Sequence, residues 1–111
     1  MSTVTPKPLV DGALLADTEG TLYTVPAATT AVARSITLCN TGATTRMVTL
    51  FVVPSGGAAD AAHRIFNDLT IEADKTIVDD TLRVLLTGGT IRGFADVGNE
   101  VAIRVDGSEV T

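Results

Sequence analysis

Aromatic rings and sulfur are scarce in this sequence. Its 111 residues include no Trp, one Tyr, three Phe and a single Cys. A small secreted domain is usually held by several disulfides, and one Cys cannot form any within the chain, so we expect assembly in a reducing compartment. The hydrophobic residues make up 45% of the chain and are mainly Ala, Val, Leu and Ile. The core is therefore predicted to be aliphatic.

Basic charge is also sparse. Eight Lys and Arg residues stand against thirteen Asp and Glu, which gives a net charge of −5, and the basic residues are scattered singly. Because nucleic acid would meet a repulsive average field, we expect no nucleic-acid partner. No stretch approaches the roughly 18 apolar residues of a membrane-spanning helix. The N-terminus also lacks a basic segment followed by an apolar run, so neither a signal peptide nor a membrane partner is indicated.

The chain has little with which to do catalysis. His63 is the sole imidazole and lies 24 positions from Cys39, so a zinc site within one chain is nearly excluded. His63 could act as the base for a nucleophile such as Ser55, Ser35 or Cys39, but no local motif supports such a pair. A surface His in a loop is the simpler interpretation. We expect no enzyme activity and no cofactor.

Acidic residues gather at two expected turns, Asp79-Asp80 and Asp96/Asn99/Glu100. Their oxygens are of the kind that binds calcium. Acidic residues at turns more often cap the local backbone and face water, so we favour that role and predict no metal site.

Thr, Val and Gly are abundant, which favours strands joined by tight turns. Apolar and polar residues alternate in 31–40, placing Val32, Arg34, Ile36 and Leu38 on one face, and Val101 begins an inward-facing row in 100–110. We predict an all-β protein: a single β-sandwich or jelly-roll-like domain. About eight short antiparallel strands are expected, at 21–26, 31–40, 46–54, 69–73, 75–80, 81–87, 90–96 and 100–110, while 55–68 is expected to be a loop with at most one helical turn.

The strand at 46–54 is apolar on both faces. One face is Val48, Leu50 and Val52, and the other carries Met47, Phe51 and Val53. A strand covered on one side by its own core normally shows polar residues on its second face. Either another subunit or a loop of the same chain must cover Phe51. Met47, Phe51 and Val53 are therefore our candidates for a subunit interface, with coverage by residues 9–15 of the same chain as the competing explanation.

Residues 1–20 show no sustained period and contain two prolines and two glycines that interrupt any regular element. We expect an extended N-terminal arm at 1–20 and a β-sandwich domain at 21–111. A merely disordered tail has little reason to be apolar, so four residues of the arm are predicted to anchor it on a partner: Leu9, Val10, Leu14 and Leu15.

Four separated pieces of the sequence resemble one protein family. LYTVPA (22–27), CNT (39–41), VPSGG (53–57) and VDGSE (105–109) occur in the order and setting typical of small structural proteins encoded by tailed bacteriophages. The resemblance covers about residues 20–110. This chain departs from the family pattern in its long, partly apolar arm and in Asp106, where an uncharged residue is common.

The resemblance implies a β-sandwich module that is present in many copies on a phage particle. Such proteins are capsid decoration, head-fibre or tail-associated components. The implied partners are other virion proteins, such as the major capsid or tail proteins, and the implied location is the virion after assembly in the host bacterial cytoplasm.

We expect the subunit to self-associate, as a trimer or a symmetric ring, with residues 1–20 reaching over a neighbour or the shell. Two other classes of function stay open. A module that binds host-surface glycans is one, although the few aromatic residues argue against it. A free regulator or inhibitor made in the host cell is the other, and it would be absent from purified particles.

Overall fold

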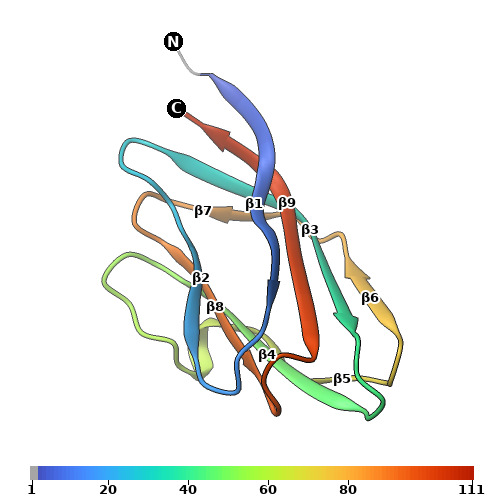
Figure 1. The fold of residues 1–111 in the computed structure, drawn as a ribbon. Coiled ribbons are helices and arrows are strands. Elements are labelled where there is room, and N and C mark those ends of the chain that lie inside the picture. The colour runs from blue at the N-terminus through green and yellow to red at the C-terminus, as the bar shows by residue number, and fades with distance from the viewer. Residues whose placement is uncertain (1–2) are drawn as a thin grey trace.

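The computed structural model describes residues 3–111 as two β-sheets packed face to face (Figure 1). A single 3₁₀ turn, η1 (Ala61–His63), interrupts the strands. No helix in this part of the chain is long and apolar enough to cross a membrane. The strands are β1 (Val4–Leu14), β2 (Gly20–Thr24), β3 (Thr30–Asn40), β4 (Arg46–Val53), β5 (Arg64–Ile71), β6 (Thr76–Asp79), β7 (Arg83–Leu85), β8 (Thr90–Ala95) and β9 (Val101–Val110).

The strand order is that of a jelly roll. Sheet A has the order β1-β9-β3-β6, with β7 also paired to β3, and sheet B has the order β2-β8-β4-β5. Every pair is antiparallel. The chain changes sheet at most of its turns, and among the described strands only β4 and β5 are both consecutive and paired. The prediction of an all-β, jelly-roll-like sandwich is confirmed.

The predicted arm is instead part of the sandwich. Residues 4–14 form β1, which pairs with β9 along its length at the edge of sheet A. Two register shifts in this pairing, after Pro8 and after Val10, break the period that would have marked a strand in the sequence. Residues 1 and 2 of the predicted arm lie outside the described residues.

A second correction concerns the predicted loop at 55–68. Its helical turn is found as η1, but the strand that follows begins at Arg64, five residues before the predicted start at Leu69. Asp68 adopts a left-handed backbone with φ of 51°, and the pairing with β4 shifts register around it. Because of these irregularities, apolar and polar residues do not alternate regularly along β5, and the first part of the strand is not recognised from the sequence.

A bulge in β3 overturns one predicted face. Ala33 pairs with Gly107 and Ser35 with Asp106, so Arg34 is an extra residue between them. Ala31 and Ala33 are buried in the core before the bulge, and Ile36 and Leu38 after it. Val32 and Arg34 therefore point away from the core, contrary to the prediction that they share a face with Ile36 and Leu38.

The core between the sheets is aliphatic, as predicted. Apart from Asn40, its largest fully buried side chains are Leu, Ile and Val. The accessible surface of the chain is 5719 Å², close to the roughly 5,800 Å² that a folded monomer of this mass exposes on average. The chain therefore hides most of its apolar surface by itself, and any surplus must be local.

Candidate interaction surface

The structure separates the seven residues predicted for an interface into two groups. Five of them are buried within the chain: Leu9, Val10, Leu15, Phe51 and Val53. Leu9, Val10 and Leu15 belong to the core between the sheets, so as anchors on a neighbour they are wrong. Only Met47 and Leu14 are exposed, at 45% and 52%.

Phe51 is enclosed by its own chain, which answers why the second face of β4 is apolar. Only 2% of Phe51 is exposed. Its ring lies 6.2 Å from that of Phe94 in β8, and the Arg64 guanidinium lies 5.5 Å from the Phe51 centroid. Residues 54–63 leave β4, fold back through η1 against that strand and bring Arg64 into place. The proposed subunit face of Phe51 and Val53 is therefore wrong, and a loop with its flanking strand provides the cover.

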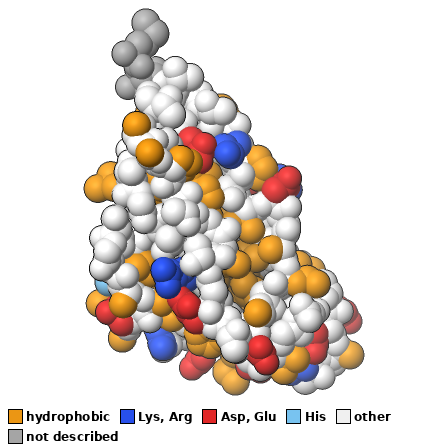
Figure 2. Space-filling view, turned by 60° about the vertical axis from the view of Figure 1, so that its left-hand side comes forward, with side chains coloured by type: hydrophobic (Ala, Val, Ile, Leu, Met, Phe, Trp, Pro, Cys, Tyr) orange, Lys and Arg blue, Asp and Glu red, His pale blue; other side chains and the backbone are white. Residues whose placement is uncertain are grey.

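Exposed apolar side chains instead gather on one side of the sandwich. Eight large hydrophobic residues of the described chain are exposed, and six of them lie on sheet A or on the segment that carries β6 and β7 at its edge: Val4, Leu14, Val78, Leu82, Val84 and Leu86. Figure 2, which shows a single face of the molecule, has hydrophobic side chains reaching the surface over much of the view, with acidic and basic side chains next to each other in places. The distribution makes sheet A the candidate interaction surface.

The outer face of sheet A is divided along its strands. Near the chain termini, the registered row Pro6, Ser108, Val32 and Val84 carries no charge. Towards the middle of the sheet, the Arg104 guanidinium donates to Asp106 at 3.0 Å and to Asp11 at 2.9 Å. One half of the face is therefore suited to apolar contacts, and charged pairs lie in its centre.

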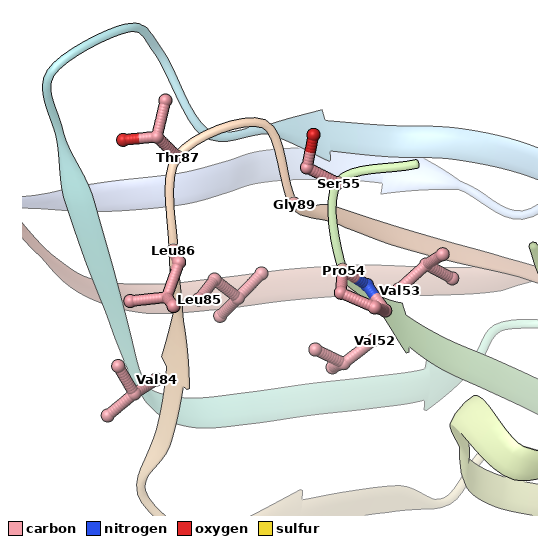
Figure 3. Close-up of a pocket in the computed structure, with 9 residues that line it drawn as sticks. All are labelled: Val52, Val53, Pro54, Ser55, Val84, Leu85, Leu86, Thr87 and Gly89. Carbon is pink, nitrogen blue, oxygen red and sulfur yellow. The ribbon is translucent and has the colours of Figure 1, made fainter. Parts of the chain in front are cut away.

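An open groove of about 450 Å³ adjoins this face between the end of β4 and the β7–β8 connection (Figure 3). It exists because β5 pairs with β4 only as far as Phe51, so no described strand lies beside Val52 on that side. In Figure 3, Leu85 points into the groove towards Val52 and Pro54, whereas Val84 and Leu86 point to the opposite side. No ionisable side chain lines the groove, so it offers apolar contact rather than chemistry.

Two motifs of the resemblance, LYTVPA and VDGSE, meet at one end of the sandwich. Tyr23 of LYTVPA donates a hydrogen bond from its hydroxyl to Glu109 of VDGSE, and Lys7 donates to the same carboxylate at 3.3 Å. Val25 exchanges backbone hydrogen bonds with the Gly88-Gly89 turn, where its N–H donates to Gly89 and its carbonyl accepts from Gly88. The Tyr23–Glu109 contact joins the two sheets, and the Val25 contacts extend the pairing of β2 with β8, so these motif residues help to hold the fold together.

Burial and hydrogen bonding shift the pKa values of the Tyr23 and Glu109 pair in opposite directions. Burial, followed by the hydrogen bond to Glu109, raises the pKa of the Tyr23 hydroxyl. The hydrogen bond from Tyr23 lowers the pKa of Glu109, and Lys7 adds to the effect. Both shifts favour a neutral phenol beside an ionised carboxylate, which is a structural pairing rather than a catalytic one.

The CNT motif is also structural. Asn40 is fully buried, and its amide donates to the carbonyls of Thr44 at 2.8 Å and Ile71 at 3.0 Å. Its carbonyl oxygen accepts from the N–H of Gly42 at 3.0 Å. Asn40 thus shapes the β3–β4 turn and links sheet A to β5 of sheet B. Cys39 is a half-buried free thiol on the outer side of β3.

The residues considered for catalysis and metal binding are engaged in local contacts. Nδ1 of His63 lies 2.8 Å from the carbonyl oxygen of Ala58, next to Asp60 of the η1 cap. Asp79 accepts from the N–H of Thr81 at 2.9 Å and from Arg83, and these contacts hold its pKa below the ordinary value. Among residues 3–111, no three His, Cys, Asp or Glu side chains gather closely enough to hold a metal ion.

Sequence reasoning missed the apolar surface itself. Leu82, Val84 and Leu86 alternate at period two and are 53%, 55% and 69% exposed. The signal was present in the sequence but was obscured by Leu85, an inward residue that makes 84–86 a continuous apolar run. Such a run is indistinguishable from a fully buried strand until the register of its edge is known.

No protein-family profile matches this sequence, and no curated protein matches it. The fold is similar to chains in solved structures of infectious bursal disease virus. The T13 viral particle matches 98% of this chain and 30% of the viral chain, with a TM-score of 0.54 at 10% identity. The structure of the Gx strain matches with a TM-score of 0.51 at 10% identity, over 99% of this chain and 32% of the viral chain. The VP2 subviral particle matches with a TM-score of 0.50 at 9% identity, over 98% of this chain and 32% of the viral chain.

The protein described here thus spans about a third of the length of those viral chains. At such low identity the likeness establishes the fold alone. The chain has a jelly-roll fold of the kind found in virus particles.

Proposed function

We propose that this chain is a non-enzymatic structural component of a virus particle, one that self-associates and docks on the particle surface. The observation that carries the proposal is the uncharged, apolar half of the outer face of sheet A, on a jelly roll that otherwise hides its apolar surface. Exposed apolar patches rimmed by polar residues mark protein contact sites. The shared fold with chains of viral particles supports the same function.

The finer assignment is to a tailed bacteriophage, as a capsid decoration, head-fibre or tail-associated protein located in the virion. It is supported by the four motif pieces at 22–27, 39–41, 53–57 and 105–109. Residues in these pieces make the contacts that hold the sandwich together, such as those of Tyr23, Asn40 and Glu109. A family that keeps such residues keeps a rigid module, which is what a repeated building unit requires.

The two alternative classes lack a corresponding feature. A glycan-binding module would offer exposed aromatic rings, but Phe51 is buried, Phe66 and Phe94 are partly buried, and Tyr23 is hydrogen-bonded to Glu109. A free regulator made in the host cell has no need of a module that resembles virion proteins.

Mass spectrometry of purified particles, compared with the soluble fraction of the same lysate, tests the proposal. We expect the chain to sediment with the particles and to remain bound after a high-salt wash, because apolar contacts are not weakened by salt screening. Recovery only from the soluble fraction would contradict it and would favour the regulator. A glycan array probed with the isolated protein tests the remaining alternative, and specific hits would support it.

A further inference from the structure

We propose that the outer face of sheet A packs on the same face of a second copy of this chain, about a two-fold axis parallel to the strands. This inference rests on the proposed function and deepens it, because it names both the partner and the surface. The axis keeps each residue at its own height along the strands and exchanges the strand positions, so β1 faces β6 and β7 while β9 faces β3.

The register of sheet A makes the apolar ends of this face complementary to each other. Pro6 and Val84 lie at opposite ends of one registered row, so each meets the other across the axis. The next outward-facing row towards the chain termini begins with Val4, which pairs with Val110, the partner of Thr30. Leu86 lies at the other end of this row, because its neighbour Leu85 pairs with Ala31, the residue after Thr30. The 60% exposed Val4 thus faces the 69% exposed Leu86 of the second copy.

Charge complementarity favours the same arrangement. Two carboxylates, Asp11 and Asp106, share one guanidinium, that of Arg104, which leaves an excess negative charge at the centre of the face. Arg34, raised outward by the β3 bulge, makes no ion pair within residues 3–111. It lies at the height of Asp106, since Ser35 is the partner of Asp106. Across the axis Arg34 meets Asp106 of the second copy, and the contact occurs twice.

These four charges cancel on the face, although the whole chain carries a net charge of −5. Two copies can therefore approach through sheet A without the repulsion that their other surfaces would produce.

The size of the face also suits a second copy. Three strands of ten or eleven residues, together with the short β6 and β7 at the edge, give a flat footprint of about 600 Å² at about 3.3 Å per residue and about 4.8 Å between strands. Two such faces together remove about 1,200 Å² from water, which is within the range of specific interfaces. The apolar half alone is too small for a stable contact, so the whole face must take part. Aligned packing of two twisted sheets at about −30° permits this.

Light scattering after size exclusion at tens of micromolar gives the first test. We expect a mass of twice the 11.4 kDa of the chain. Replacing Val84→Ser together with Leu86→Ser is expected to weaken the dimer at least tenfold. The matched control is Met47→Ser with Val97→Ser, which removes two exposed apolar side chains away from sheet A and should leave the dimer unchanged.

A charge exchange tests the two-fold geometry. Arg34→Asp and Asp106→Arg should each weaken self-association about tenfold or more, because each places like charges together. A mixture of the two variants should recover dimers, because both contacts of the mixed dimer pair opposite charges. Circular dichroism and thermal unfolding of each variant confirm that it is folded.

A mass equal to that of a monomer at tens of micromolar overturns the inference. A dimer that is unaffected by the double substitution of Val84 and Leu86 overturns it as well. A trimer or a ring closed through another surface, which the sequence analysis favoured, also overturns it. None of these results removes the protein from purified particles, so they leave its role as a particle component standing, and a monomer would contradict only the self-association in the proposed function. Conversely, a dimer of the expected behaviour that is absent from particles would contradict the proposed function alone.

Discussion

The hydroxyl of Tyr23 in β2 donates a hydrogen bond to the carboxylate of Glu109 in β9, 86 residues further along the chain. The contact joins sheet B to sheet A at the end of the sandwich where both chain termini lie (Figure 1). Lys7 of β1 completes the cluster by pairing with the same carboxylate. Three side chains, from three strands and both sheets, thus meet in one cluster.

Tyr23 is the only tyrosine and the chain has no tryptophan, so its ionisation can be followed directly. Burial is the main cause of its raised pKa and Glu109 the second. We expect near-ultraviolet phenolate absorbance to appear well above the ordinary value of 10.0. Because the folded pKa is raised, stability should fall as the pH rises above that value. Glu109→Gln should lower the midpoint without restoring it fully, and an unchanged midpoint would contradict the contact.

Glu109 should stabilise the fold at neutral pH and lose that effect in acid. Its pKa is lowered by the hydrogen bond from Tyr23 and by Lys7. A lowered carboxylate pKa gives stability that is present above the ordinary value of 4.5 and lost as the pH falls below it. Urea unfolding at several pH values should show the free-energy difference between wild type and Glu109→Gln shrinking in that window. Glu72→Gln, at an exposed site, should follow the wild type throughout.

Asn40→Ala should destabilise the fold by about 2–4 kcal/mol, because it leaves the buried carbonyl of Ile71 unpaired and removes two further hydrogen bonds of the β3–β4 turn. The carbonyl of Ile71 and the N–H of Gly42 would lose their partner, and the carbonyl of Thr44 would lose it as well. Chemical denaturation measures the loss. Asn67→Ala serves as the control because Asn67 is exposed, and a comparable loss there would refute the importance assigned to Asn40.

Gly107→Ala should be among the most damaging single substitutions, at about 4 kcal/mol or more. A Cβ at this position would overlap the carbonyl oxygen of Val32, which lies opposite in the bulged β3–β9 pairing. A Cβ at Gly20 meets no atom within 4 Å, so Gly20→Ala is the matched control. Thermal unfolding should show a large drop in the midpoint for the first variant only.

The sequence was informative wherever strands are regular. In β9, Val101, Ile103 and Val105 alternate with outward residues as predicted, and at most 1% of each is exposed. Residues 41–45 and 97–99, which separate expected strands in the sequence analysis, also lie between strands in the structure. Period-two patterns reveal strands of this kind because one face is buried and the other is solvated.

The errors arise at register shifts. Because of the bulge at Arg34, the residues of β3 before it face the opposite way from the prediction. Because of the register shifts in β1, residues 4–14 show no regular alternation, and the strand was predicted to be an arm. A bulge adds one residue to one strand alone, so its presence depends on the partner strand, which one segment of sequence does not specify. The exposed face of sheet A was missed for the same reason, since its rows combine residues from four strands.

The enclosure of Phe51 required tertiary information too, and it leads to a contrast between two residues of β4. Phe51 is 2% exposed and Met47 is 45% exposed. Phe51→Ala should cost about 3–5 kcal/mol, the usual range for truncating a buried aromatic side chain, whereas Met47→Ala should stay within about 0.5 kcal/mol. Denaturant unfolding of dilute protein separates the two cases. If Phe51→Ala instead left stability intact but lowered the oligomer mass, Phe51 would belong to a subunit contact and its cover by Arg64 would be mistaken.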